Sequence, residues 1–205
     1  MSLKLYFAPF TRASRPRFLL EEMGVPYELA LVDLKAGEQK GEAYRAVHPL
    51  GVVPALDDDG IVIVESAAIC MHLADRFPEK HMAPAPGTKE RGLYYEWIVF
   101  TMATLEPRFI KFKEVHDDKG GPNGTNRNSD DERAKAEKNV DAALALLEAR
   151  VGAPFAVGDA LTAADCVLGG CLVWIHSQRP LDAYPRLKEY AHRIKGRAAF
   201  AKAMR

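Results

Sequence analysis

The segment His48 to Leu56 (HPLGVVPAL) carries a proline where the sequence predicts the start of a strand. A cis X-Pro peptide bond is typically found at such a position, in a tight turn at the head of a strand. If the Val53-Pro54 bond is cis, the peptide of Val53 faces outward and can pair with an extended peptide, main chain to main chain. The segment therefore predicts a peptide-binding edge, and an ordinary turn is the alternative interpretation.

A second segment with binding chemistry is Glu65-Ser66, directly before the predicted helix AAICMHLADRF. Ser66 is placed as a helix cap, and the free N–H groups of the first helical turn form a site for a carboxylate. Glu65 can take an ammonium group. The pair therefore matches the zwitterion of an α-amino acid, and a serine cap beside an exposed glutamate is the alternative.

These two segments belong to a region of mixed strand and helix patterns, residues 1–77. A strand, a helix and a strand within about thirty residues predict a βαβ unit with parallel strands, and an Asp-rich turn between two later apolar runs predicts a hairpin. A polar segment at 35–47 has weak helical character. The expected strands are 3–7, 27–32, 54–56 and 61–64, the hairpin turn is 57–60, and the expected helices are 15–23 and 66–77.

The second region has only helical patterns. Three prolines and a glycine in residues 78–87 place a domain boundary there, which predicts domains at 1–78 and 88–205. Within the second domain, Thr162-Ala163-Ala164-Asp165 is a capping box with a stabilising role. The glycine- and asparagine-rich segment 117–131 is interpreted as a loop that is mobile in solution, either an inert insertion or a lid. The expected helices are 88–115, 131–151 and 163–177, with shorter ones after Pro185 and Gly196.

The composition limits the classes of partner and compartment. Lysine plus arginine and aspartate plus glutamate each total 28, so no net field attracts nucleic acid. Cys70, Cys166 and Cys171 lack CxxC or CxxH spacing and are expected to be reduced core residues, without a metal role. The start MSLKLYF does not resemble a signal peptide, and no apolar run is long enough to span a membrane. We expect a cytoplasmic protein without nucleic-acid or membrane partners.

Five stretches together resemble the cytosolic glutathione transferase superfamily, across nearly the whole chain. Each stretch alone is weak, but all five in family order and spacing are specific. The resemblance implies an N-terminal thioredoxin-like βαβαββα domain, an α/β fold, and a C-terminal helical bundle for a second substrate. The five stretches are LKLYFAP, RFLLEEMGVPYEL, HPLGVVPAL, ESAAICMHLADRF and VGDALTAADCVLG.

The resemblance also implies the ligand and its contacts. Glutathione is the expected co-substrate, with no metal. Val53 would contact its cysteinyl backbone and Pro54 would be cis, while Glu65 and Ser66 would hold the γ-glutamyl group. A small hydrophobic electrophile and a second copy of the chain, in a homodimer, are the other expected partners.

The residue that activates the thiol stays open among four candidates. Family classes place this donor either at the end of the first strand, where Tyr6 lies, or in the loop before the first helix. That loop holds Thr11, Arg12 and Ser14. Arg12 occupies the position of the cysteine of the bacterial beta class, so cysteine chemistry is not expected. We order the candidates as Thr11 with Arg12, then Ser14, then Tyr6.

The second substrate is expected between this loop and the long helix 88–115. Phe10 would face it from the loop, and Phe100, Thr101, Thr104 and Trp174 from the helices. Two alternative functions share the same architecture: glutathione-dependent peroxide or disulfide reduction, and non-catalytic binding of glutathione or a protein.

Overall fold

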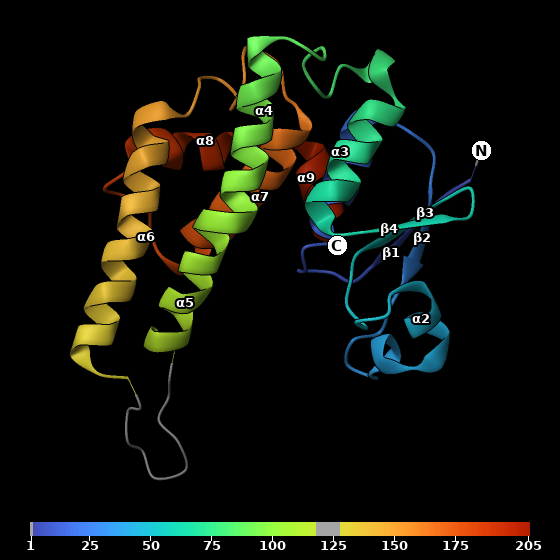
Figure 1. Cartoon of the computed structure of the whole chain (residues 1–205), viewed down its shortest axis with the longest axis horizontal. Coiled ribbons are helices and arrows are strands. Elements are labelled where there is room, and N and C mark those ends of the chain that lie inside the picture. The colour runs from blue at the N-terminus through green and yellow to red at the C-terminus, as the bar shows by residue number, and fades with distance from the viewer. Residues whose placement is uncertain (1, 118–127) are drawn as a thin grey trace.

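The structure is a computed structural model that describes residues 2–117 and 128–205 (Figure 1). Most of the predicted loop 117–131, to which the interpretation as an insertion or a lid applies, lies outside the described residues.

The N-terminal part is a four-stranded mixed sheet with helices. Strand β1 pairs in parallel with β2 and antiparallel with β3, and β3 pairs antiparallel with β4, in the order β2-β1-β3-β4. Helix α1 is the crossover between the parallel strands, as the predicted βαβ unit requires. The elements are β1 (Leu3–Phe7), α1 (Ser14–Met23), β2 (Glu28–Leu31), η1 (Glu38–Lys40), α2 (Glu42–Val47), β3 (Ala55–Asp58), β4 (Ile61–Val64) and α3 (Ser66–Arg76).

The predicted hairpin is confirmed, but its turn is shorter than expected. Asp58 pairs with Ile61, so the connection is the two residues Asp59 and Gly60. Both have positive φ, 51° and 92°, as a turn that matches the right-handed twist of its strands requires. Strand β3 begins at Ala55, because Pro54 has no N–H to donate to a ladder.

The rest of the described chain is helical. A core of buried apolar side chains runs without interruption from the sheet and α1 into α7, and α7 packs against α1, α3, α4 and α8. The elements are η2 (Pro78–Lys80), α4 (Lys89–Phe100), η3 (Thr101–Leu105), α5 (Glu106–His116), α6 (Asp130–Arg150), α7 (Ala163–Gln178), α8 (Pro185–Lys195) and α9 (Ala198–Ala203).

The long helix predicted at 88–115 is interrupted by a π-helical turn, η3, between α4 and α5. Pro107 explains the interruption, because it has no N–H to donate to the carbonyl of Ala103 and the helix widens in the turn before it. The turn ends next to Glu106, the first residue of α5.

Two predictions about the core are confirmed: the three cysteines are core residues, and Thr162 and Asp165 form a capping box. The three cysteines are fully buried, and burial raises the pKa of the Cys70 thiol to about 12. The carboxylate of Asp165 is also fully buried. It accepts hydrogen bonds from the N–H (2.8 Å) and hydroxyl (3.0 Å) of Thr162, and from the Ala156 N–H and the Tyr190 hydroxyl, both at 2.7 Å. These bonds fix the start of α7 to α8.

Candidate functional site

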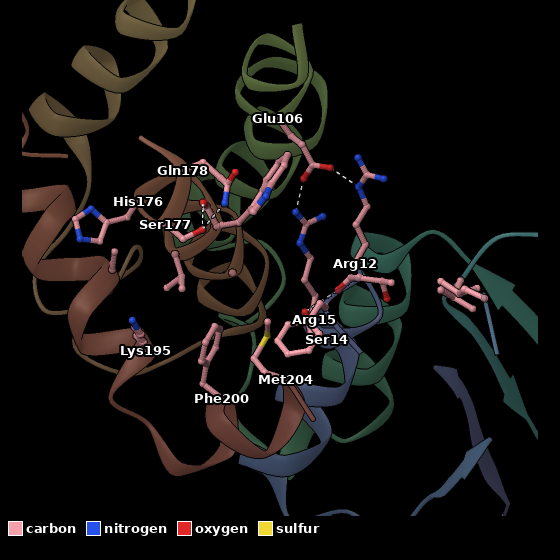
Figure 2. A pocket seen from close by; sticks show the side chains of 18 of the residues that line it. Arg12, Ser14, Arg15, Glu106, His176, Ser177, Gln178, Lys195, Phe200 and Met204 are labelled. Atoms are coloured by element: carbon pink, nitrogen blue, oxygen red, sulfur yellow. Dashed lines mark hydrogen bonds and ion pairs between the residues drawn. The ribbon is translucent and has the colours of Figure 1, made fainter. Parts of the chain in front are cut away.

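Two adjacent cavities lie where the sheet meets the helices. The larger has a volume of about 930 Å³ and the smaller about 250 Å³. Four residues line both: Arg12, Val52, Val53 and Glu106. Figure 2 shows the larger cavity, with Arg12 and Glu106 joined at one side.

The smaller cavity brings together the two binding segments of the sequence. Val53, Pro54, Glu65 and Ser66 all line it, and the Val53-Pro54 peptide bond is cis. The main chain of Val53 lies just outside β3. Glu65 has a φ of 71°, a left-handed conformation that is unusual for a non-glycine residue and that recurs at ligand-binding sites.

The predicted role of Ser66 as a helix cap is wrong. Helix α3 begins at Ser66 itself, Glu65 occupies the N-cap position, and neither side chain caps the helix. The Ser66 hydroxyl instead lies 3.3 Å from Nη1 of Arg15. The first N–H groups of α3 lack partners within the helix, so the start of the helix remains suited to an anion.

A buried ionic network stands between the two cavities. The carboxylate of Glu106, which is 2% exposed, accepts hydrogen bonds from Nε of Arg12 and Nη2 of Arg15. Burial alone would raise the pKa of Glu106, but the charges and hydrogen bonds of Arg15 and Arg12 lower it below its usual value. Glu106 is therefore ionised at neutral pH.

Arg12 is the member of this network that faces open space. Its side chain is 51% exposed, and its terminal nitrogens make no hydrogen bond to any described residue. Arg15, in contrast, is 5% exposed and also contacts Ser66 and Met102. The Arg12 guanidinium can therefore donate to an anion in either cavity.

The other three candidates for thiol activation are arranged differently. The Thr11 hydroxyl donates to the carbonyl of Ala8 at 2.7 Å, and the Ser14 hydroxyl donates to the carbonyl of Thr11 at 2.8 Å. Both residues line the larger cavity, but their hydroxyl protons are already donated to carbonyl groups of the loop. Tyr6 lines neither cavity; its ring packs edge-on against Tyr44, 5.7 Å away.

The larger cavity contains two of the five residues expected to meet a second substrate. Phe10 and Trp174 line it, whereas Phe100, Thr101 and Thr104 line neither cavity. Thr101 lies in the π-helical turn, fully buried, with its hydroxyl donating to the carbonyl of Trp97 at 2.7 Å. The wall is formed instead by α7, α8 and α9, through residues that include Val173, His176, Ser177, His192, Lys195, Phe200 and Met204.

Several residues that line the cavities are not among the site residues predicted from the sequence, including Arg15, Glu106, His48 and Lys195. One signal was available for Glu106. It is the one carboxylate in the segment 99–109, and a charge in an apolar helical face needs a buried partner. No local pattern identifies that partner as Arg15, because the two residues lie 91 positions apart.

Within the described residues, no group of three or more His, Cys, Asp or Glu side chains is arranged to hold a metal ion. In the same part of the chain, no helix has the length and apolar character needed to cross a membrane.

The chain matches two family models. The glutathione S-transferase N-terminal domain matches residues 1–75 and the C-terminal domain matches residues 130–193. A relative from Hypomyces subiculosus, glutathione S-transferase hmp2, is 37% identical over 110 residues, which are 50% of this chain and 51% of that protein. The chain thus spans about half the length of the curated relatives it matches.

Solved structures match over nearly the full length. A glutathione transferase from Methylococcus capsulatus strain Bath is 32% identical with a TM-score of 0.81, and the match covers 98% of this chain and 97% of that one. A sphingomonad glutathione S-transferase, complexed with glutathione, is 30% identical with a TM-score of 0.78, covering 98% and 96%. The thioredoxin-like and helical architecture is therefore confirmed, and the chain belongs to the glutathione S-transferase family.

Proposed function

We propose that this protein is a glutathione S-transferase, which binds glutathione in the smaller cavity and directs its thiolate at an electrophile held in the larger one. One observation carries the proposal. Val53-Pro54 and Glu65-Ser66, from separate segments, line one small cavity that shares Arg12 with a larger, mostly apolar cavity.

The cysteinyl and γ-glutamyl parts of glutathione have counterparts in the smaller cavity. The main chain of Val53 suits the cysteinyl backbone. The carboxylate of Glu65 suits the γ-glutamyl ammonium group, and the N–H groups at the start of α3, with Ser66, suit the γ-glutamyl carboxylate. Arg15, beside the Ser66 hydroxyl, adds positive charge at this end.

Arg12 is our candidate for stabilising the thiolate. A thiol with a pKa of about 8.5 needs roughly 2.7 kcal/mol of differential stabilisation to become mostly ionised at neutral pH. One or two charge-assisted hydrogen bonds from Arg12 can supply this. Thr11 and Ser14 hold the loop that positions Arg12, and Glu106 fixes its guanidinium through Nε.

The decisive experiment combines binding with turnover. We expect calorimetry to detect binding of glutathione at millimolar concentrations or below. We also expect the turnover rate with a chlorinated nitroaromatic to exceed the rate with a hydroperoxide or a mixed disulfide. Uptake without turnover would instead favour a binding protein, and preferred disulfide turnover a reductase. Absence of glutathione uptake by the folded protein would end the proposal.

Substitution of Arg12 tests its role separately from binding. Arg12→Gln should raise the apparent pKa of kcat/KM by about one unit, while the Kd of glutathione changes less than about threefold. Thr11→Val and Ser14→Ala serve as comparison variants. If either of them moves the pKa more than Arg12→Gln does, the activating residue is a hydroxyl.

We also propose that two copies of the chain associate. Aliphatic side chains are exposed on both domains: Ile61 (70%) on the edge strand β4, and Val99 (58%) and Leu93 (42%) on α4. Light scattering after size-exclusion chromatography measures the mass directly, and we expect Val99→Asp to shift the protein toward a monomer.

A further inference from the structure

The larger cavity is apolar in the middle and cationic at both ends. Val173, Trp174, Phe200 and Met204 form the apolar part. In Figure 2, Arg12 lies at one side, and Lys195 and His176 lie at the opposite side. The volume of about 930 Å³ is that of a site for an extended small molecule.

Lys195 is a cation without a partner among the described residues. It ends α8, lines the cavity, and forms no ion pair or hydrogen bond with any described residue. Lys188, on the same helix, is paired with Asp182 at 2.6 Å. The single carboxylate among the lining residues is Glu106, which already binds Arg12 and Arg15. No described acidic side chain of the wall therefore neutralises Lys195.

His176, on the same wall as Lys195, is a neutral hydrogen-bonding group. Nδ1 of His176 lies 3.2 Å from the N–H of Leu181 and accepts from it, which leaves the ring proton on Nε2. Burial, followed by the charges of His192 and Lys188, lowers the pKa of His176, so the ring is a neutral donor at pH 7. Ser177 and Gln178 also line the wall, but the Ser177 hydroxyl donates to the carbonyl of Trp174, and the Gln178 amide is hydrogen-bonded to Ser177 and Lys113.

Phe10 gives the cavity an aromatic face. Its side chain is 81% exposed, and its φ of 58° places a bulky residue in the left-handed region. Exposure of a large apolar ring from a strained main chain is characteristic of a binding surface. Phe10 and Trp174 are both available to stack on an aromatic ligand.

We infer that the second substrate is an aromatic electrophile that carries a carboxylate remote from the reacting carbon, and that Lys195 binds this carboxylate. The inference rests on the proposed function. With the aromatic ring beside Phe10 and Trp174, the reacting carbon faces Arg12 and the carboxylate reaches Lys195. A single lysine with the neutral donor His176 on the same wall matches a singly charged group.

The test uses two substrates that differ in charge, 4-chloro-3-nitrobenzoate and 4-chloro-3-nitrobenzamide. In each, the glutathione sulfur forms a bond to the chlorine-bearing carbon, chloride leaves with the electron pair of the broken bond, and the thiol proton passes to solvent. Lys195→Gln should lower kcat/KM about tenfold for the benzoate and less than about twofold for the benzamide. Lys195→Arg should retain the preference, and the wild-type rate with benzoate should fall with salt.

Lys138→Gln is the matched control, because it removes the same charge from an exposed residue of α6 that lines neither cavity. It should change neither rate. If Lys195→Gln lowers kcat/KM equally for both substrates, or for neither, the inference is wrong. Turnover of the benzamide would still support the proposed function in that case.

A binding measurement without glutathione separates the two proposals. Calorimetry with the unreactive pair biphenyl-4-carboxylate and biphenyl-4-carboxamide should show tighter binding of the acid, and Lys195→Gln should abolish the difference. Should glutathione not bind at all, the proposed function fails, but this measurement still decides whether Lys195 forms an anion site. Equal affinity of wild type for acid and amide would overturn it.

Discussion

The two cavities share Arg12 and Glu106, but their walls are held in different ways. The wall of the smaller cavity includes Ser66 (2% exposed), beside the buried pair Glu106 (2%) and Arg15 (5%). Glu106 and Arg15 also line the larger cavity, which in addition presents exposed or half-buried side chains such as Phe10 and Trp174. Buried, mutually bonded groups are fixed by the fold, whereas exposed ones can change without disturbing it. Substitution within the buried ionic pair should therefore affect stability together with glutathione binding, whereas substitution of an exposed residue such as Phe10 should change second-substrate selectivity alone.

Glu106→Gln gives the largest expected effect. It leaves the buried Arg15 without an anionic partner, and breaking a buried ion pair from one side typically costs about 3–5 kcal/mol of unfolding free energy. Urea denaturation should show this loss, together with weaker glutathione binding. Glu114→Gln, on the exposed side of α5 beside Lys111, should have no measurable effect. Equal midpoints for the two variants would show that the ionic network does not hold the smaller cavity.

The same residue predicts a pH dependence. The folded-state pKa of Glu106 lies below its usual 4.5, because Arg15 and Arg12 favour the charged form more than burial disfavours it. Its stabilisation is therefore complete above pH 4.5 and is lost as the pH falls through the folded-state pKa. Glutamine does not titrate, so the gap in unfolding free energy between wild type and Glu106→Gln should be constant near neutrality and narrow in acid. A gap that widens in acid would contradict the assignment.

Ser66→Ala should act on binding more than on folding. The hydroxyl lies 3.3 Å from Arg15 and lines the smaller cavity, so its removal takes away one polar contact to glutathione. We expect the Kd of glutathione to rise about fivefold to twentyfold, and the unfolding free energy to fall by about 1 kcal/mol or less. Ser177→Ala, in the larger cavity, should leave the Kd unchanged. If Ser177→Ala weakens glutathione binding as much, the two cavities are not separate sites.

The contrast between the cavities also explains what the sequence could reveal. The strand β1, the hairpin and the cis bond at Pro54 depend on neighbours along the chain: alternation of Leu3, Leu5 and Phe7, and proline at a strand head. Such local rules indicate the two segments as candidates, whereas their contacts with glutathione rest on the family resemblance, and no local rule identifies Arg15 as the partner of Ser66. Strand and helix ends differ by one or two residues, since caps and pairing decide them.

The larger cavity depends on packing that no local rule specifies. Its wall is assembled from the loop 8–14 and from α7, α8 and α9, which meet only after the helices pack. The aromatic residues of α4 occur on several sides of the helix, so its pattern does not orient Phe100 toward a ligand. The π-helical turn before Pro107 then places Thr101 in the core, an irregularity that a regular helical period cannot anticipate.

Phe10 offers the smallest effect, and it tests whether the larger cavity is independent of the fold. Phe10→Ala and Phe10→Gly both remove the exposed ring, but only glycine adopts a φ of 58° without steric cost. Glycine avoids the steric cost of the left-handed conformation, but it also adds conformational entropy to the unfolded chain, which offsets part of that gain. The glycine variant should therefore be more stable than the alanine variant by about 0.5–1 kcal/mol. Both should lose roughly the same factor in kcat/KM for an aromatic electrophile while binding glutathione normally. A glycine variant no more stable than the alanine variant would show that the conformation at Phe10 carries no strain. Loss of glutathione binding in both variants would show that Phe10 contributes to the smaller cavity as well as to the larger one.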